Sequence, residues 1–153
     1  MDPILRQEIE QFLASARTLS LATVDEGGRA HAANVWYAQD AGCRLYFISN
    51  PAAAHSQHVA RHPDVAATIY FHTDRTNQIH GLQLHGRCTP LADAAQERRA
   101  LELFSAKFPQ VLLNPAAAER LKTERFYLLD PTWLRWIDNR RGFGFKAEWE
   151  PQV

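Results

Sequence analysis

The order of hydrophobic and polar residues predicts a chain built mainly from short strands and preceded by one helix. Asp2 can cap a helix whose first position is Pro3, and apolar residues follow at helical spacing until near Ala16. The residues expected to share the buried face of this helix are Leu5, Ile9, Phe12 and Leu13.

Strand-like segments then recur between turn signals. Runs rich in β-branched and aromatic residues occur at 18–24, 29–38, 44–49, 65–71 and 79–91. Residues 25–28 have the turn chemistry of a hairpin, and Asn50-Pro51 ends the third run because proline cannot donate to a strand ladder. Gly81 and Gly86 lie inside the fifth run, where glycine is typical of a bulge or a barrel bend.

The second half of the chain combines helices with further strands. A short helix at 52–61 is expected to end at His62-Pro63, since the residue before a proline leaves the helical region. Residues 72–78 form a polar loop. Asp93 caps a later helix that Pro109 ends, and Pro115 opens another.

The C-terminal part is predicted to return to strand. Segments 126–129 and 133–137 are strand-like but separated by Asp130-Pro131, and a polar turn at 138–142 precedes a last segment at 143–149. Hairpin-length turns join most of the strands. The sequence therefore predicts a mainly β fold, a small six-stranded antiparallel barrel with helical additions, as a single domain over 1–153.

Composition supports a globular protein and narrows its partners. The chain has 153 residues, of which 46% are hydrophobic and 22% charged. Seventeen basic residues balance seventeen acidic ones, so the basic field that nucleic-acid binding requires is absent, and nucleic acid is excluded as a main partner.

No apolar run approaches the roughly 18 residues of a membrane span, and no secretory signal is recognised, so we expect no membrane association and a cytoplasmic location. The two cysteines, Cys43 and Cys88, match no zinc or redox spacing and are expected to be reduced thiols.

The first chemical signal is the sequence Ser49-Asn50-Pro51, which leads from a strand into a helix containing His55. Free N–H groups at such a helix start suit an anion such as phosphate. The alternative is that Ser49 and Asn50 only cap and turn the chain. No nucleotide-binding or hydrolase motif was found.

Histidines and aromatic residues leave further alternatives open. His55, His58 and His62 would share one helix face, as in two-histidine metal sites, but a complete ligand set is missing and no metal is assigned. His80 and His85 are five residues apart in a strand and therefore face opposite sides. The aromatic residues at 133–149 either close the barrel or cover a planar ligand or a partner chain.

Several segments together resemble the pyridoxamine 5′-phosphate oxidase-like, FMN-binding split-barrel superfamily, and its small bacterial branch in particular. The similar segments cover nearly the whole chain, and the tail motif is the more specific of them. They are 45–50, 62–65, 81–86, 136–139, 142–144 and 146–149.

The resemblance implies a homodimer of six-stranded Greek-key split barrels, with FMN in each of two clefts between the subunits. It implies that Ser49 and Asn50 meet the FMN phosphate and that His55 stands where the superfamily has a lysine. The remaining residues implied to contact the cofactor are Asn34, Trp36 and Gln83 and, from the partner chain, Trp136 and Lys146.

The departures from the family pattern weaken the phosphate site. Ala32 replaces an arginine, His55 replaces a lysine, and Lys146 replaces a tail arginine. Two fixed positive charges near the phosphate are thereby lost, and so is bidentate recognition at the tail. We expect weaker FMN binding, and no true pyridoxamine-phosphate oxidase activity.

Three functional hypotheses remain. The first is a flavin-dependent oxidoreductase of unknown substrate, for which the sequence singles out no catalytic residue. The second is a non-enzymatic binding protein for a planar ligand, flavin or haem, since the chain has seven histidines. The third is a dimer whose cleft binds nothing.

Overall fold

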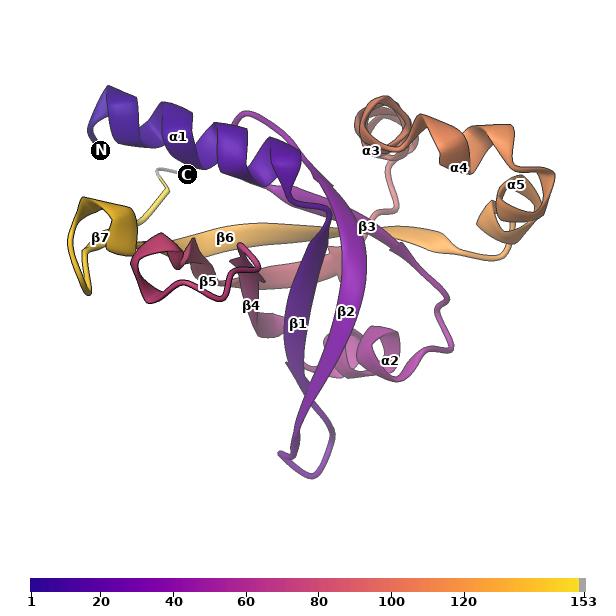
Figure 1. Cartoon of the computed structure of the whole chain (residues 1–153). Helices are drawn as coiled ribbons and strands as arrows, with labels where there is room; N and C mark the ends of the chain where they lie inside the picture. Colours follow the sequence, from indigo (N-terminus) through magenta and orange to yellow (C-terminus); the bar gives the residue numbers. More distant parts are fainter. Residues whose placement is uncertain (152–153) are drawn as a thin grey trace.

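The structure, a computed structural model, describes residues 1–151 and consists of an antiparallel sheet with helices packed around it (Figure 1). The strands are β1 (Thr18–Val24), β2 (Ala30–Gln39), β3 (Leu45–Ser49), β4 (Asp64–Tyr70), β5 (His80–Pro90), β6 (Arg125–Asp138) and β7 (Lys146–Trp149). The α-helices are α1 (Pro3–Ser15), α2 (Ala54–Arg61), α3 (Ala94–Lys107), α4 (Pro109–Leu113) and α5 (Pro115–Leu121), and short 3₁₀ turns lie at Thr76–Gln78 (η1) and Asn139–Arg141 (η2).

The sheet closes into a barrel. Its strand order is β3-β2-β1-β4-β5-β6-β7, and β3 also pairs with β6, so six strands form the closed wall and β7 lies outside it. All pairings are antiparallel. This confirms the predicted mainly β class and the six-stranded antiparallel barrel.

Alternation along the strands fills the barrel with apolar side chains. Leu19, Leu21, Leu82 and Leu84 point inward and are almost fully buried, together with the aromatic rings of β2, β3 and β6. Helix α1 begins as predicted, with the Asp2 carboxylate accepting a hydrogen bond from the Ile4 N–H. It adds all four predicted apolar residues to this core.

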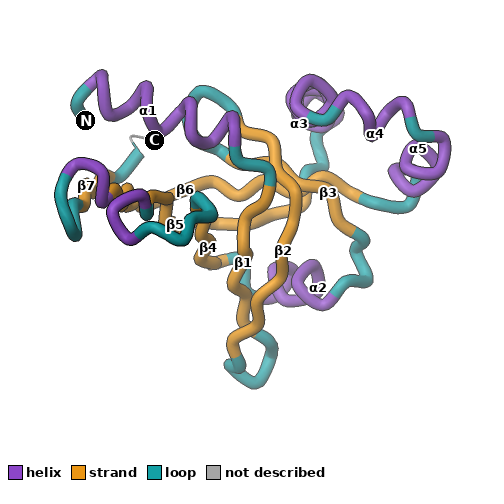
Figure 2. Tube along the Cα trace, viewed as in Figure 1, coloured by secondary structure: helices purple, strands orange, loops and turns teal. Residues whose placement is uncertain are grey.

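Helices α3, α4 and α5 form a separate layer beside β2, β3 and β6, with smaller apolar clusters of their own (Figure 2). Lys107, at the end of α3, joins this layer to the rest of the fold. Its Nζ donates to the Leu13 carbonyl and the Gln39 Oε1, both at 2.8 Å, and lies 3.9 Å from the Tyr37 ring centre. Burial and the nearby charge of Arg17 lower the pKa of Lys107 to about 7.

Both cysteines are free and buried, as expected for reduced core thiols. Burial raises the pKa of the Cys88 thiol to about 12, so this sulfur is a poor nucleophile. Each helix within residues 1–151 is too short or too polar to cross a membrane.

Three sequence predictions need correction. Strand β6 runs unbroken through Asp130-Pro131, which was expected to interrupt it. Pro109 does not only end a helix, because it is also the first residue of α4. The last strand starts at Lys146 rather than 143, since Gly142 and Gly144 have positive φ and keep the intervening segment in a turn.

A bulge explains why β6 tolerates its proline. The β5–β6 register shifts between His85 and Gly86, so that His85 faces Trp133 while Gly86 faces Pro131, and Thr132 is the extra residue. Before the bulge the inward side chains of β6 are odd-numbered, and after it they are even-numbered. The proline therefore lies at a bulge, where a missing N–H costs little.

Gly86 is the residue that permits this close approach of two strands, and it provides a test. A Cβ at position 86 would overlap the Asp130 carbonyl oxygen and lie 3.0 Å from the Pro131 Cα. Gly86→Ala should lower the free energy of unfolding by about 1–3 kcal/mol, because backbone atoms must move to make room. Denaturant titration measures this change.

The matched control is Gly27→Ala. At this turn the nearest atom to an added Cβ is a side-chain oxygen of Asp25 at 3.4 Å, so the change in stability should stay within about 0.5 kcal/mol. Equal stability of the two variants would contradict the role assigned to the bulge.

Candidate functional site

One face of the sheet carries outward side chains that lie in register across six strands. We call this surface the open face, because most of its side chains are exposed or half-buried, and Trp36 at one end of it packs on Phe108, between α3 and α4. Three adjacent rows make it up. The first row is Asn34, Ser20, Thr68, Gln83, Arg135 and Glu148; the second is Trp36, Thr18, Tyr70, Gly81, Ile137 and Lys146; the third is Ala32, Ala22, Ala66, His85 and Trp133.

The first row is polar along its whole length. The Ser20 hydroxyl donates to Asn34 Oδ1 at 2.7 Å. Arg135 donates to Gln83 Oε1 at 3.4 Å and forms a 2.7 Å ion pair with Glu148. Neighbouring amide, hydroxyl and guanidinium groups thus present both donors and acceptors to a ligand lying on the sheet.

The second row presents two large aromatic side chains to solvent. Trp36 is 46% exposed and Tyr70 is 68% exposed. One face of the Trp36 indole stacks on Phe108, with ring centres 4.9 Å apart, which fixes its orientation. Thr18, the partner of Trp36, belongs to β1, so one strand separates the strands that carry the two aromatic side chains.

The third row combines small residues with one histidine. The small side chains of three alanines, Ala32, Ala22 and Ala66, protrude little from the sheet. The larger side chain of His85 lies next to Ala66 in this row, and its ring centre is 4.7 Å from that of Trp133. A pocket of about 410 Å³ lies here, lined by Ala22, Ala66, His85 and neighbouring residues. The arrangement offers an exposed imidazole next to an apolar hollow.

Four of the residues predicted to contact a cofactor lie on the open face. Asn34 and Gln83 belong to the first row, and Trp36 and Lys146 to the second. Asn34 and Trp36 belong to β2 and Lys146 to β7, and these two strands do not pair with each other.

The predicted phosphate loop lies at the start of α2, and its side chains bind one another. Ser49 is buried, its Oγ lies 2.6 Å from His55 Nε2, and it accepts a hydrogen bond from the Ser56 hydroxyl. Asn50 Oδ1 accepts a hydrogen bond from the Ala52 N–H, and this bond stabilises a local turn of the chain. Both alternatives for this loop thus have support: the polar side chains are used internally, while the first N–H groups of α2 lack a side-chain cap.

Electrostatics make the loop a weak site for the FMN phosphate. Burial, with a smaller contribution from His58, lowers the pKa of His55, so its imidazole is neutral at pH 7. A neutral imidazole bound to a serine does not replace the fixed charge of a lysine. The residues present fit a planar ring better than they fit a phosphate group.

Trp136 occupies a different place from the one that the resemblance implied. It is 0% exposed and packs against Phe12 and His80 inside the barrel. Its indole nitrogen makes no hydrogen bond and is fully buried. This is the position of a core residue, and the bulge at Thr132 puts it there by exchanging the inward and outward sides of β6.

The α2 histidines separate into different environments. His58 Nδ1 lies 2.9 Å from Thr23 Oγ1, and its ring packs against His31. His62 follows the end of the helix. Within residues 1–151, no group of three or more histidine, cysteine or acidic side chains is placed to hold a metal ion.

Sequence reasoning missed most of the open face. Ser20, Thr68, Tyr70 and Arg135 join the predicted residues only through strand register, which the sequence does not show. The prediction that His80 and His85 face opposite sides is confirmed, since His80 is buried and His85 exposed. The alternation of buried and exposed residues along β5 was the sequence signal that could have placed His85 on the outer surface.

The chain was compared with family sequence models, with curated proteins and with solved structures. A sequence model described as pyridoxamine 5′-phosphate oxidase matches residues 5–138. A search of curated proteins found no significant match.

Solved structures with the same fold share less than a quarter of the residues, so they show the fold alone. A haem-binding protein from Mycobacterium smegmatis is 19% identical, with 99% of this chain and 60% of that chain covered and a TM-score of 0.74. A haem storage protein from Vibrio cholerae is 18% identical, with 82% and 88% covered and a TM-score of 0.69. A candidate pyridoxamine 5′-phosphate oxidase from Listeria innocua is 19% identical, with 86% and 97% covered and a TM-score of 0.66.

The family match extends over most of the chain and agrees with the barrel topology. The protein therefore belongs to the pyridoxamine 5′-phosphate oxidase family.

Proposed function

We propose that this protein binds a planar cofactor, flavin or haem, on the open face, in a cleft completed by a second copy of the chain. The observation that supports it is the pair of exposed aromatic side chains, Trp36 and Tyr70, beside a continuous polar row on the outer side of the sheet. Planar ligands are held by this combination of aromatic contacts and a few convergent polar groups.

The second copy is proposed because one chain alone leaves the ligand half-covered. A ring lying on one sheet has its other side in water, whereas cofactor sites bury most of the ligand surface. The rows of the open face lie on the outer wall of the barrel, so one chain supplies only one side of a ligand site. A homodimer would supply the opposite wall and would also cover Trp36 and Tyr70.

With a flavin bound, the isoalloxazine would supply hydride transfer, and the protein would act as an oxidoreductase. Asn34 and Ser20 would hydrogen-bond the polar edge of the ring, and Trp36 would pack on its apolar part. No carboxylate of the open face is free to act as an acid or base beside the ring, because Glu148 is paired with Arg135. The role of the chain is therefore to bind, orient and exclude water.

Haem is the second candidate, and His85 is the observation that favours it. Its imidazole is exposed on the open face beside the pocket of about 410 Å³. A neutral imidazole is a common axial ligand of haem iron, and the low alanine surface leaves room for a macrocycle. Two structures of the same fold are of proteins that bind or store haem.

The proposal is tested by adding FMN or haemin to the purified protein, removing the unbound compound and recording the absorbance spectrum. At least one of them should remain bound. Trp36→Ala should then weaken its binding by roughly tenfold, because the ring loses a stacking partner. Ile4→Ala is the control, since Ile4 is an exposed apolar side chain of α1 and belongs to none of the three rows. Loss of both compounds on desalting, or unchanged binding in Trp36→Ala, would reject the open-face site.

The phosphate loop has its own test, the comparison of FMN with riboflavin. If the start of α2 meets the phosphate, His55→Ala weakens FMN binding by a few fold, since the loop loses the partner that orders Ser49. Riboflavin has no phosphate, so its affinity should not change. Titrations that follow flavin fluorescence measure both affinities. An equal effect on the two flavins would place the phosphate elsewhere.

For haem, the expected result is a shifted Soret band that depends on His85. His85→Ala should abolish the shift, because the iron loses its axial ligand. His62→Ala is the matched control, being an exposed histidine at the end of α2. Absorbance titration with haemin gives the comparison. A Soret shift that survives in His85→Ala would exclude His85 as the ligand.

A further inference from the structure

A second cavity, separate from the open face, lies between α1 and the end of the barrel. Its volume is about 620 Å³, and none of the open-face rows contributes to its lining. We call it the α1 cavity. Its lining includes Glu8 and Gln11 from α1, Phe71 after β4, His80 at the start of β5, and Arg140 and Arg141 of η2.

His80 is a nearly buried imidazole with one nitrogen free. The residue is 8% exposed, and its Nδ1 lies 2.7 Å from the Gln78 carbonyl, which can only accept, so Nδ1 carries the proton. The ring is clamped by stacking on Phe71 and by edge contacts to Phe12 and Trp136. Nε2 has no partner among residues 1–151, and it is not enclosed as the Trp136 nitrogen is, so it opens to the cavity.

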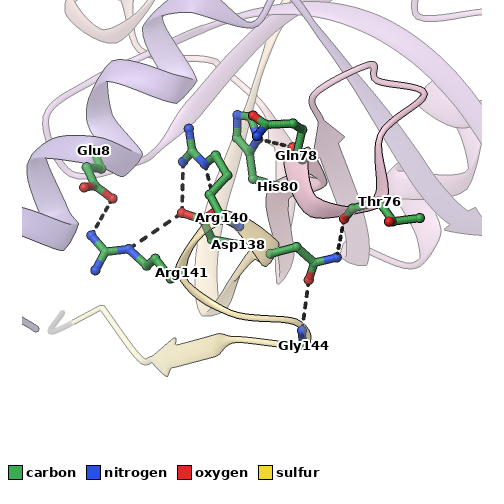
Figure 3. A network of polar contacts seen from close by, with 9 residues as sticks. Glu8, Thr76, Gln78, His80, Asp138, Arg140, Arg141 and Gly144 are labelled. Carbon is green, nitrogen blue, oxygen red and sulfur yellow. Dashed lines mark hydrogen bonds and ion pairs between the residues drawn. The ribbon is translucent and has the colours of Figure 1, made fainter.

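Two arginines are held at the cavity by a buried carboxylate (Figure 3). Asp138 receives Arg140 through Nε at 2.7 Å and Nη2 at 2.9 Å, and Arg141 approaches it at 3.6 Å. Burial acts to raise the pKa of Asp138, but hydrogen bonds from Arg140 outweigh it and lower the pKa, so the carboxylate stays charged. Arg140 is therefore fixed in position, with its Nη1 making no hydrogen bond inside the described chain.

The third charged contact of the cavity, the ion pair between Arg141 and Glu8, can be replaced by a contact to a ligand. Arg141 Nη2 donates to Glu8 Oε2 at 2.7 Å, and both side chains are partly exposed. Such a pair contributes little to stability, so an incoming oxyanion can take the place of Glu8. Two guanidinium groups then face one anion, which is the geometry that carboxylates and phosphates favour.

We propose that the α1 cavity binds a small planar anion, an aromatic ring that carries a carboxylate or a phosphate monoester. The oxyanion contacts Arg140 and Arg141, the ring packs on the exposed side of Phe71, and His80 Nε2 accepts a hydrogen bond from a ring substituent. Phe71 already stacks on His80 with one face, which leaves its other face for the ligand.

Calorimetric titration with phenyl phosphate and with benzoate tests the site, and inorganic phosphate shows whether the ring contributes. At least one of the two aromatic anions should bind more tightly than inorganic phosphate. Arg141→Gln should weaken that binding about tenfold, because a charge-assisted hydrogen bond is lost. Glu8→Gln should strengthen it about threefold, because the competing carboxylate is removed.

The opposite signs of these two changes separate a ligand site from a structural cluster, since both variants lose the same ion pair. Glu10→Gln is the matched control: it removes an exposed pair with Arg6 on the same helix but outside the cavity, and should leave affinity unchanged. Trp36→Ala should also leave it unchanged, which distinguishes this site from the open face. Failure of both aromatic anions to bind, or weaker binding in Glu8→Gln, would overturn the proposal.

Discussion

The bulge between β5 and β6 decides which side chains of the longest strand face the core. Thr132 of β6 has no partner on β5. This one extra residue exchanges the inward-facing and outward-facing positions in the rest of β6. Trp136 and Asp138 thereby turn inward, while Arg135 and Ile137 reach the outer surface. Both the open face and the α1 cavity depend on this exchange, since each takes residues from β6 or the turn that follows it.

The sequence was sufficient for most of the elements but not for their mutual register. Helix α1, β1 and the hairpin that follows could be predicted, because an aspartate cap, a proline and strict alternation all act locally. The continuity of β6 could not, because Pro131 is tolerated only where Gly86 lies opposite on another strand.

The site residues divide in the same way. Asn34, Trp36 and Gln83 lie on the outer surface, where an alternating strand would place them. Trp136 would also face outward if β6 had no bulge, and the inserted residue explains why it lies in the core instead. The α1 cavity escaped prediction altogether, since it joins residues from α1, β5 and η2 that no spacing in the sequence connects.

Closure of the barrel also bears on how the chain folds. The pairing of β3 with β6 joins residues 45–49 to residues 125–129, and the whole of β4, β5 and the helical layer lies between them. Contacts so distant along the chain form only after the intervening loop has lost its conformational freedom. We therefore expect slow folding for a protein of this length, with the β3–β6 seam among the last contacts to form.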